Sequence, residues 1–310
     1  MAARQSIVSF YKFIPLDDLP LLKKSLQSLC LSEHLQGTIV IAGEGINGML
    51  AGCEAGIGAL SSFLKSDPRF ADMPIKTSYH QGTIFRRMLV KIKKQCLTLR
   101  TPADPASKTG KRLAPLELKR WLDEGRDILL LDTRNDYEYA AGSFRGALDP
   151  QTKSFDEFPA WTAEHLATAK QRTIVTFCTG GIRCEKATAV MLEQGFSDVY
   201  QLDGGIISYL EQTLASEDNH WDGECIVFDK RHAVDKHLQT STKEHCFVCL
   251  AELTAASSAR VVFPAGKACS PCATKMQEHQ QARQASGSAR HQQNLLRRHE
   301  FILKQQRKHP

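Results

Sequence analysis

The chain has 310 residues and a formal net charge of +6, with 42% hydrophobic and 24% charged residues. This composition excludes fibrous and low-complexity chains, and the length predicts two or three compact domains. No run approaches the roughly 18 apolar residues of a membrane helix, and no apolar signal core follows the start Met-Ala-Ala-Arg. We therefore expect a cytoplasmic protein that does not enter a membrane.

The first hundred residues predict a small α+β domain. Helix-like runs lie at residues 16–31 and 54–65, and strand-like runs lie at residues 6–13, 37–42, 46–51 and 75–80. The resulting order β-α-β-β-α-β is that of a ferredoxin-like, or acylphosphatase-like, domain. We place this domain at residues 1–100.

A basic zone covers residues 73–103, where no acidic residue occurs. Arg86, Arg87, Lys91 and Lys93 in this zone are the candidate RNA-binding residues. Cations that neutralise backbone phosphates release counterions and give salt-dependent affinity for nucleic acid. A solvated basic face is the alternative interpretation.

A linker is predicted at residues 101–113, where two prolines and a glycine interrupt any periodicity. The next domain is placed at residues 114–220 and alternates helix-like with strand-like runs. Residues 128–132 and 173–177 are short continuous apolar runs, as is typical of buried parallel strands. The pattern predicts a doubly wound parallel sheet.

Cys178 follows the second of these runs and precedes a helix-like run from Glu185 to Glu193. Open α/β sheets bind ligands at this carboxyl end of a strand. The loop amides and the helix N-terminus favour an anion, and such surroundings lower a cysteine pKa from about 8.5. Cys178 is therefore the candidate nucleophile, and a buried structural cysteine is the alternative. The candidate anion site consists of the amides of Thr179, Gly180, Gly181 and Ile182.

Four residues separate Cys178 from Arg183, one fewer than in cysteine phosphatases. The shorter loop suits a smaller anion, such as the sulfur of a persulfide. In this loop the chain resembles the rhodanese family. The resemblance continues in the stretches Asp132–Ala147 and Val199–Ile206, which occur in the family's order.

Residues around the loop are expected to have supporting roles. Asp132 and Arg134 are expected to support it, with an ordinary ion pair as the alternative. Arg183 is expected to anchor the loop or to neutralise developing negative charge. Cys184 either resolves an oxidised thiol or is structural.

Two C-x-x-C pairs, separated by 19 residues, indicate a third, cysteine-rich module at residues 221–275. This spacing is typical of a tetrahedral structural zinc site, with a redox dithiol or free thiols as alternatives. The candidate ligands are Cys246, Cys249, Cys269 and Cys272. Residues 276–310 form a basic, Gln-rich tail, either disordered or helical.

The whole arrangement resembles the rhodanese-domain tRNA uridine hydroxylases of bacteria, over residues 5 to about 275. Besides the loop, Glu44–Gly48, Phe85–Lys91 and Trp221–Asp229 contribute to this resemblance. It implies conversion of the wobble uridine (position 34) of tRNA to 5-hydroxyuridine, with O2 as co-substrate. Cys178 would act as a thiolate or a persulfide. The reductant and the oligomeric state are left undefined.

Two other functions fit the same residues. A rhodanese-type sulfurtransferase would pass persulfide sulfur from Cys178 to tRNA or a small acceptor. A non-catalytic tRNA-binding protein would use only the basic surfaces.

Overall fold

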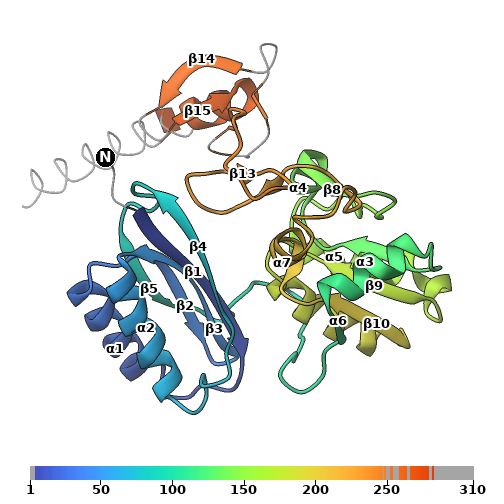
Figure 1. Cartoon of the computed structure of the whole chain (residues 1–310), viewed down its shortest axis with the longest axis horizontal. Coiled ribbons are helices and arrows are strands. Elements are labelled where there is room, and N and C mark those ends of the chain that lie inside the picture. Colours follow the sequence, from blue (N-terminus) through green and yellow to red (C-terminus); the bar gives the residue numbers. More distant parts are fainter. Residues whose placement is uncertain are drawn as a thin grey trace, which may run out of the picture. The chain divides into compact units, whose positions relative to one another are not determined.

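The computed structural model describes residues 4–246, 248, 252–253, 258–263, 266–278 and 281–282 (Figure 1). The chain divides into two compact units, Met1–Ser241 and Thr242–Pro310. Within the described residues, none of the helices has both the length and the apolar character needed to span a bilayer.

The N-terminal domain is a five-stranded sheet with two helices on one face (Figure 1). Its elements are β1 (Arg4–Phe13), α1 (Leu19–Ser32), β2 (Gln36–Ala42), β3 (Gly45–Gly52), α2 (Glu54–Ser66), β4 (Ile75–Gln81) and β5 (Met88–Ile92). The strands lie in the order β4-β1-β3-β2-β5. Leu26 of α1, Leu60 of α2 and Ile39 of β2 are buried together between the helices and the sheet. The predicted ferredoxin-like order is confirmed over the first six elements.

The fifth strand, β5, was not predicted. It pairs in parallel with β2, from Gly37 opposite Met88 to Ile41 opposite Ile92. Only Val90 is buried in β5, so the apolar alternation that marks a strand is too short to recognise. Charged residues in this strand, such as Lys91, suit an edge strand because they oppose pairing with another chain.

The central domain is a parallel sheet with helices on both faces. Its elements are β6 (Lys111–Leu113), α3 (Pro115–Asp123), β7 (Leu129–Asp132), α4 (Asp136–Ala141), η1 (Phe155–Glu157), α5 (Phe158–His165), η2 (Ala167–Ala169), β9 (Thr173–Phe177), α6 (Ile182–Glu193), β10 (Asp198–Leu202) and α7 (Gly205–Gln212). The strands are all parallel, in the order β6-β10-β9-β7. Along β9, Val175 and Phe177 pack with α3 and α7, whereas Ile174 packs with α5 and α6. The predicted doubly wound sheet is confirmed.

Part of the predicted linker at residues 101–113 is structured. Its last three residues are β6, which pairs in parallel with β10. Just before β6, the Gly110 amide donates a hydrogen bond to Thr188 Oγ1 (2.8 Å). Two of the three residues of β6 are exposed and charged, so the sequence pattern gave no sign of this edge strand.

Phe144 lies at the centre of an aromatic cluster in the central domain. It ends β8 (Gly142–Phe144), which pairs with β11 (Trp221–Gly223). Its ring meets those of Phe177, Tyr209 and Trp221 edge-on, at centroid distances of 4.9, 4.7 and 5.2 Å. Edge-to-face contacts of this kind add to the free energy gained from burial.

Residues 221–241, which we assigned to the cysteine-rich module, lie in the first unit. Trp221 packs into the core of the central domain, and so do Cys225 of β12 (Cys225–Ile226) and Val234 of β13 (Ala233–Val234). These apolar side chains join the segment to the central sheet.

The second unit contains an antiparallel pair, β14 (Ser258–Phe263) and β15 (Gly266–Cys269) (Figure 1). Helical residues 270–278 follow β15. Cys246, Cys269 and Ala273 are buried together in a small cluster. Most of the predicted tail, residues 276–310, lies outside the described residues.

The aromatic cluster predicts the effect of truncating its central residue. Phe144→Ala should lower the free energy of unfolding by about 3–5 kcal/mol, because it removes a buried ring and leaves a cavity. Urea denaturation measures the change. Leu116→Ala, at a side chain that is 56% exposed, is the control and should change stability by less than about 0.5 kcal/mol. Equal losses in the two variants would contradict the role of Phe144.

Candidate active site

The Cys178 loop joins β9 to α6. Strand β9 ends at Phe177, and α6 begins at Ile182, three residues earlier than the predicted start at Glu185. Gly181 caps the helix with φ = 101°, a left-handed conformation that favours glycine. The loop proper is therefore Cys178–Gly181, and Arg183 belongs to the first turn of α6.

Cys178 is a buried thiol, 2% exposed, whose neighbours favour the thiolate. The Gly181 amide donates a hydrogen bond to its Sγ (3.1 Å). Burial by itself would raise the pKa of Cys178. The Cys184 thiol and the Arg183 charge act against burial, as do two backbone amides, and the pKa of Cys178 falls to about 6. A thiol with this pKa is mainly ionised at neutral pH and is nucleophilic.

The predicted anion site is only partly formed by the amides that we named. The Gly181 amide bonds to Sγ, and the Arg183 amide, which was not predicted, also stabilises the thiolate. In the described part of the chain, the amides of Thr179, Gly180 and Ile182 make no hydrogen bond to Sγ. The Thr179 hydroxyl donates instead to Ile226 O (3.4 Å). The earlier start of α6 explains this, because it brings the helix N-terminus next to Cys178.

A second turn, at Gly204 and Gly205, holds the loop through hydrogen bonds from the residues that follow it. The Ile206 amide donates to Cys178 O (2.9 Å), and the Ile207 amide donates to Thr179 O (3.1 Å). Gly205 approaches so closely that a Cβ there would lie 2.4 Å from Cys178 O. Only glycine fits this position. The stretch that ends at Ile206, identified by resemblance, thus contacts the loop directly.

Cys184 lies beside Cys178 and is its protonated partner. Burial raises the pKa of Cys184 well above its usual value, and the neighbouring Cys178 raises it further. Its Sγ also lies 3.7 Å from Thr133 Oγ1. Cys184 therefore donates a hydrogen bond to the thiolate rather than competing with it as a nucleophile.

Arg183 forms a buried ion pair with Glu138, a residue that our sequence analysis did not single out. Its Nη1 and Nη2 donate to the two carboxylate oxygens at 2.8 and 3.0 Å. The Glu138 side chain has no exposed surface, and its position is fixed because it also accepts a hydrogen bond from the Asn135 amide at the start of α4 (3.1 Å). This N-x-x-E capping pattern is the signal in the sequence that could have identified Glu138.

Asp132 and Arg134 form a second buried ion pair, at the end of β7. Arg134 Nη2 lies 2.6 Å from one oxygen of Asp132 and also donates to Gly142 O (2.7 Å). Between these residues, the Thr133 amide donates to Phe177 O (3.0 Å), directly before Cys178. The side chains of the pair bond to each other and to β8, and Thr133 between them fixes this segment to the end of β9.

The predicted RNA-binding residues lie around β5. Arg86, Arg87, Lys91 and Lys93 are all exposed. They form part of the surface of the N-terminal domain.

Two residues of the N-terminal domain, Tyr11 and Lys76, lie against the Cys178 loop and were not predicted. An added Cβ on Gly181 would lie 2.7 Å from the Tyr11 hydroxyl, and the Lys76 ammonium donates a hydrogen bond to Gly204 O. Because these residues belong to a separate domain, the sequence around the Cys178 loop gives no sign of their contact with it.

Three of the four predicted metal ligands lie together in the second unit. The sulfur atoms of Cys246, Cys269 and Cys272 are within 4.8 Å of one another. Cys249, the fourth, lies outside the described residues. The thiol cluster could hold a metal ion such as zinc.

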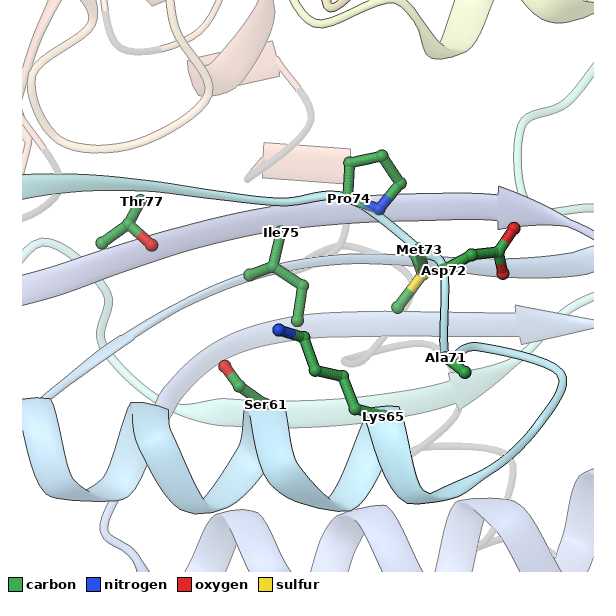
Figure 2. A pocket seen from close by; sticks show the side chains of 8 residues that line it. All are labelled: Ser61, Lys65, Ala71, Asp72, Met73, Pro74, Ile75 and Thr77. Carbon is green, nitrogen blue, oxygen red and sulfur yellow. The ribbon is translucent and has the colours of Figure 1, made fainter.

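A hollow of about 410 Å³ lies between α2 and the start of β4, and Figure 2 shows the side chains that line it. It is lined by Ser61, Lys65, Ala71, Asp72, Met73, Pro74, Ile75 and Thr77. The Ser61 hydroxyl bonds to Ile57 O in its own helix (2.9 Å), and Asp72 forms an ion pair with Lys12. None of the predicted site residues lines this hollow, and we assign it no function.

Comparison with known proteins identifies both domains of the first unit. Residues 5–96 match the family described as UPF0176 acylphosphatase like domain, and residues 114–212 match the rhodanese-like domain family. A protein of Cupriavidus necator, named tRNA uridine(34) hydroxylase, is 42% identical over 271 residues, which cover 86% of this chain and 95% of that protein. The chain belongs to the tRNA uridine(34) hydroxylase family. The resemblance predicted from the sequence is thus confirmed.

Solved rhodanese-like domains are similar to part of this member of the tRNA uridine(34) hydroxylase family. One, from an Anabaena protein, is 20% identical and covers 37% of this chain and 80% of its own, with a TM-score of 0.30. Another, from Staphylococcus aureus, is 25% identical and covers 32% of this chain and 90% of its own, with a TM-score of 0.28.

The surroundings of Cys178 predict how its alkylation depends on pH. Because the thiolate reacts, iodoacetamide should modify Cys178 with a midpoint near pH 6, below the value of about 8.5 for an ordinary thiol. Reactivity should fall as the pH drops through 6 and the thiolate is protonated. Mass spectrometry of the Cys178 peptide gives the profile. Cys96 is the internal control, since burial raises its pKa to about 12. A midpoint near 8.5 for Cys178 would contradict the ionised thiol.

Proposed function

We propose that this protein hydroxylates C5 of uridine 34 in tRNA and takes the oxygen atom from O2. One observation carries the proposal: a thiol with a pKa of about 6 directly follows β9 in a chain of the tRNA uridine(34) hydroxylase family. A thiolate attacks electron-poor carbon atoms, and C6 of a uracil ring is such an atom.

Addition of the Cys178 thiolate to C6 would make C5 reactive. The S–C6 bond forms while the C5=C6 π bond breaks, and the electron pair moves onto C5 and O4. C5 then accepts one oxygen atom from O2, and the other leaves as water. This balance takes two electrons and two protons from a reductant outside the chain. Loss of the C5 proton and departure of the Cys178 sulfur restore the ring.

We propose that Arg183 anchors the loop rather than binding the substrate. Its guanidinium is already paired through two hydrogen bonds with Glu138. From this fixed position its charge still favours the Cys178 thiolate. Cys184, as a hydrogen-bond donor, and the Asp132–Arg134 pair, as a brace of β9, are supporting groups.

The burial of Cys178 restricts the kind of base that can react. A sulfur atom in a residue that is 2% exposed cannot reach a base stacked in a duplex. Single-stranded RNA loops present bases that can be splayed out and taken into a pocket. Position 34 lies in such a loop, which fits a buried nucleophile.

We propose that the basic residues around β5 contact the tRNA backbone. Arg86, Arg87, Lys91 and Lys93 are exposed, and no acidic residue interrupts residues 73–103. Phosphate contacts of this kind position RNA and make its binding dependent on salt.

A sulfurtransferase is the second candidate. The tight loop between Cys178 and Arg183 favours it, because a small anionic sulfur would accept the same hydrogen bonds as the thiolate. In that reaction a persulfide on Cys178 would pass its outer sulfur to tRNA or a small acceptor. Such a persulfide is also an alternative nucleophile for the hydroxylation itself.

We propose that the cysteine cluster of the second unit holds a structural zinc ion. The ligands would be Cys246, Cys269 and Cys272, whose sulfur atoms lie within 4.8 Å, and Cys249. In a tetrahedral zinc site neighbouring sulfur atoms are ~3.8 Å apart, so the observed group is close to the required size. Four thiolates leave no position for a substrate, so the ion would stabilise the fold.

The proposed function also fits the remaining assignments. We propose a cytoplasmic protein, where tRNA is available. Its N-terminal domain at residues 1–100 and its central domain would act together on one RNA. The central domain consists of the predicted residues 114–220 together with β6 and residues 221–241, which pack on its sheet.

Complementation tests the role of Cys178. Cells that lack this protein should lose 5-hydroxyuridine at position 34, and Cys178→Ala should fail to restore it, whereas Cys53→Ser should restore it fully. Mass spectrometry of tRNA nucleosides measures the modification. Growth under labelled O2 should place the label in the nucleoside.

Other outcomes of that experiment would contradict the proposal in distinct ways. When the cells also receive labelled sulfur, labelled sulfur in tRNA without labelled oxygen would indicate the sulfurtransferase. Full modification with Cys178→Ala would indicate that the chain acts only as a tRNA-binding protein.

The zinc assignment predicts about one zinc ion per chain in protein prepared without chelators. Cys272→Ser should lower the zinc content by at least about half and lower the melting temperature, because three ligands hold the ion less tightly. Elemental analysis measures the metal. Cys53→Ser, far from the cluster in sequence, should leave it unchanged. Absence of zinc from the wild type would contradict the assignment but leave that of Cys178 intact.

A further inference from the structure

Tyr11 and Lys76 belong to the face of the N-terminal sheet that its helices do not cover. In β1, Val8 and Phe10 pack against the helices, so Ser9 and Tyr11 point to the opposite face. Lys76 of β4 pairs directly with Ser9 and shares that face. Both side chains therefore project from the open face of the sheet.

Lys76 is joined to the Cys178 loop through one glycine turn. Its Nζ donates a hydrogen bond to Gly204 O, and a Cβ on Gly204 would lie only 2.1 Å from Nζ. The next residue, Gly205, packs on Cys178 O, and the Ile206 amide bonds to the same oxygen (2.9 Å). Displacing Lys76 would therefore disturb the turn that holds the loop.

Tyr11 contacts the loop on the side of Gly181. A Cβ on Gly181 would lie 2.7 Å from the Tyr11 hydroxyl, and the Gly181 amide is one of the donors to Cys178 Sγ. Burial raises the pKa of Tyr11, and the nearby Glu185 and Cys178 raise it further, although Arg112 opposes them. The hydroxyl is thus neutral, and it limits the movement of the amide that holds the thiolate.

Lys76 also places a positive charge near the thiol. Burial lowers the pKa of Lys76, whereas Asp203, Glu211 and the Cys178 thiolate act in the opposite direction. Burying an ammonium group costs free energy unless anions lie nearby. The Cys178 thiolate is one of the three anions that stabilise the charge of Lys76.

We propose that the N-terminal domain completes the thiol site, with Lys76 and Tyr11 as positioning residues that hold the Cys178 loop and with the Lys76 charge favouring the thiolate. This inference rests on the proposed function for the role of Cys178. It gives the N-terminal domain a second task beside RNA binding, because a movement of its sheet would change the reactivity of the thiol.

Charge and hydrogen bonding at Lys76 can be separated by substitution. Lys76→Gln keeps a donor for Gly204 O but removes the charge, and Lys76→Arg keeps the charge. Lys65→Met, at an exposed lysine of α2, is the matched control. The measurement is the pH midpoint of Cys178 alkylation in the full chain without tRNA, together with the ratio of its rates with anionic iodoacetate and neutral iodoacetamide.

We expect Lys76→Gln to raise the midpoint by roughly half a unit to one unit, a three- to tenfold loss of thiolate below the midpoint. The iodoacetate to iodoacetamide ratio should fall about twofold or more, because a cation near the thiol is lost. Lys76→Arg should stay close to the wild type. Tyr11→Phe should raise the midpoint less than Lys76→Gln, since it loosens Gly181 but leaves the charge in place.

An unchanged midpoint and ratio in Lys76→Gln, or equal changes in Lys65→Met, would overturn the inference. If the melting temperature shows that Lys76→Gln does not fold, Lys76→Met replaces it. The midpoint should again rise and the ratio should again fall, and no change in either would overturn the inference. The titration uses no tRNA. A protein that shows the shift but does not hydroxylate uridine would overturn the proposed function and leave this inference standing.

Discussion

The site depends on the balance between the free-energy cost of burying a thiolate and the hydrogen bonds and positive charge that stabilise it. Burial alone would raise the pKa of Cys178, yet the pKa falls to about 6. Four groups outweigh burial, and two of them are backbone amides at the start of α6. Backbone donors in a helix cannot relax away from the sulfur, so the sheet, the loop and the helix must all be held in place. Arg183 adds its charge, and Glu138 keeps that charge fixed.

Glycine makes this arrangement of the backbone accessible. Gly181 takes the left-handed conformation at the start of α6, where its amide bonds to Sγ, and Gly205 lets a second turn approach the Cys178 carbonyl. A side chain at either position would clash or strain the backbone. The two glycines therefore place the loop between α6 and α7, each of which begins where it can contact the loop. A small thiol site is thus built from the ends of two helices and one strand.

Regular periodicity explains which parts of the fold could be predicted from the sequence. The strand-like run of β1 and the continuous apolar run of β9 predicted the two main sheets, apart from one edge strand of each. β5 and β6 were not predicted, because each is an edge strand with a single buried residue. At the site, Cys178 was recognisable from its place after a strand and before a helix, although Gly180-Gly181 concealed that α6 begins at Ile182. Glu138 could have been found from the N-x-x-E capping pattern, whereas Tyr11 and Lys76 are defined only by tertiary contacts, which one stretch of sequence cannot reveal.

The chain has ten cysteines, and the surroundings of the buried ones give them very different reactivities. Burial raises the pKa of Cys30 to about 11 and those of Cys96 and Cys225 to about 12. Cys178 is just as buried, so burial cannot distinguish it; the donors around it do. Cys30, Cys96 and Cys225 lie in sites where burial dominates, whereas the Cys178 thiolate has fixed donors from several elements. In the cysteine cluster of the second unit, a metal ion rather than the protein backbone would stabilise the thiolates.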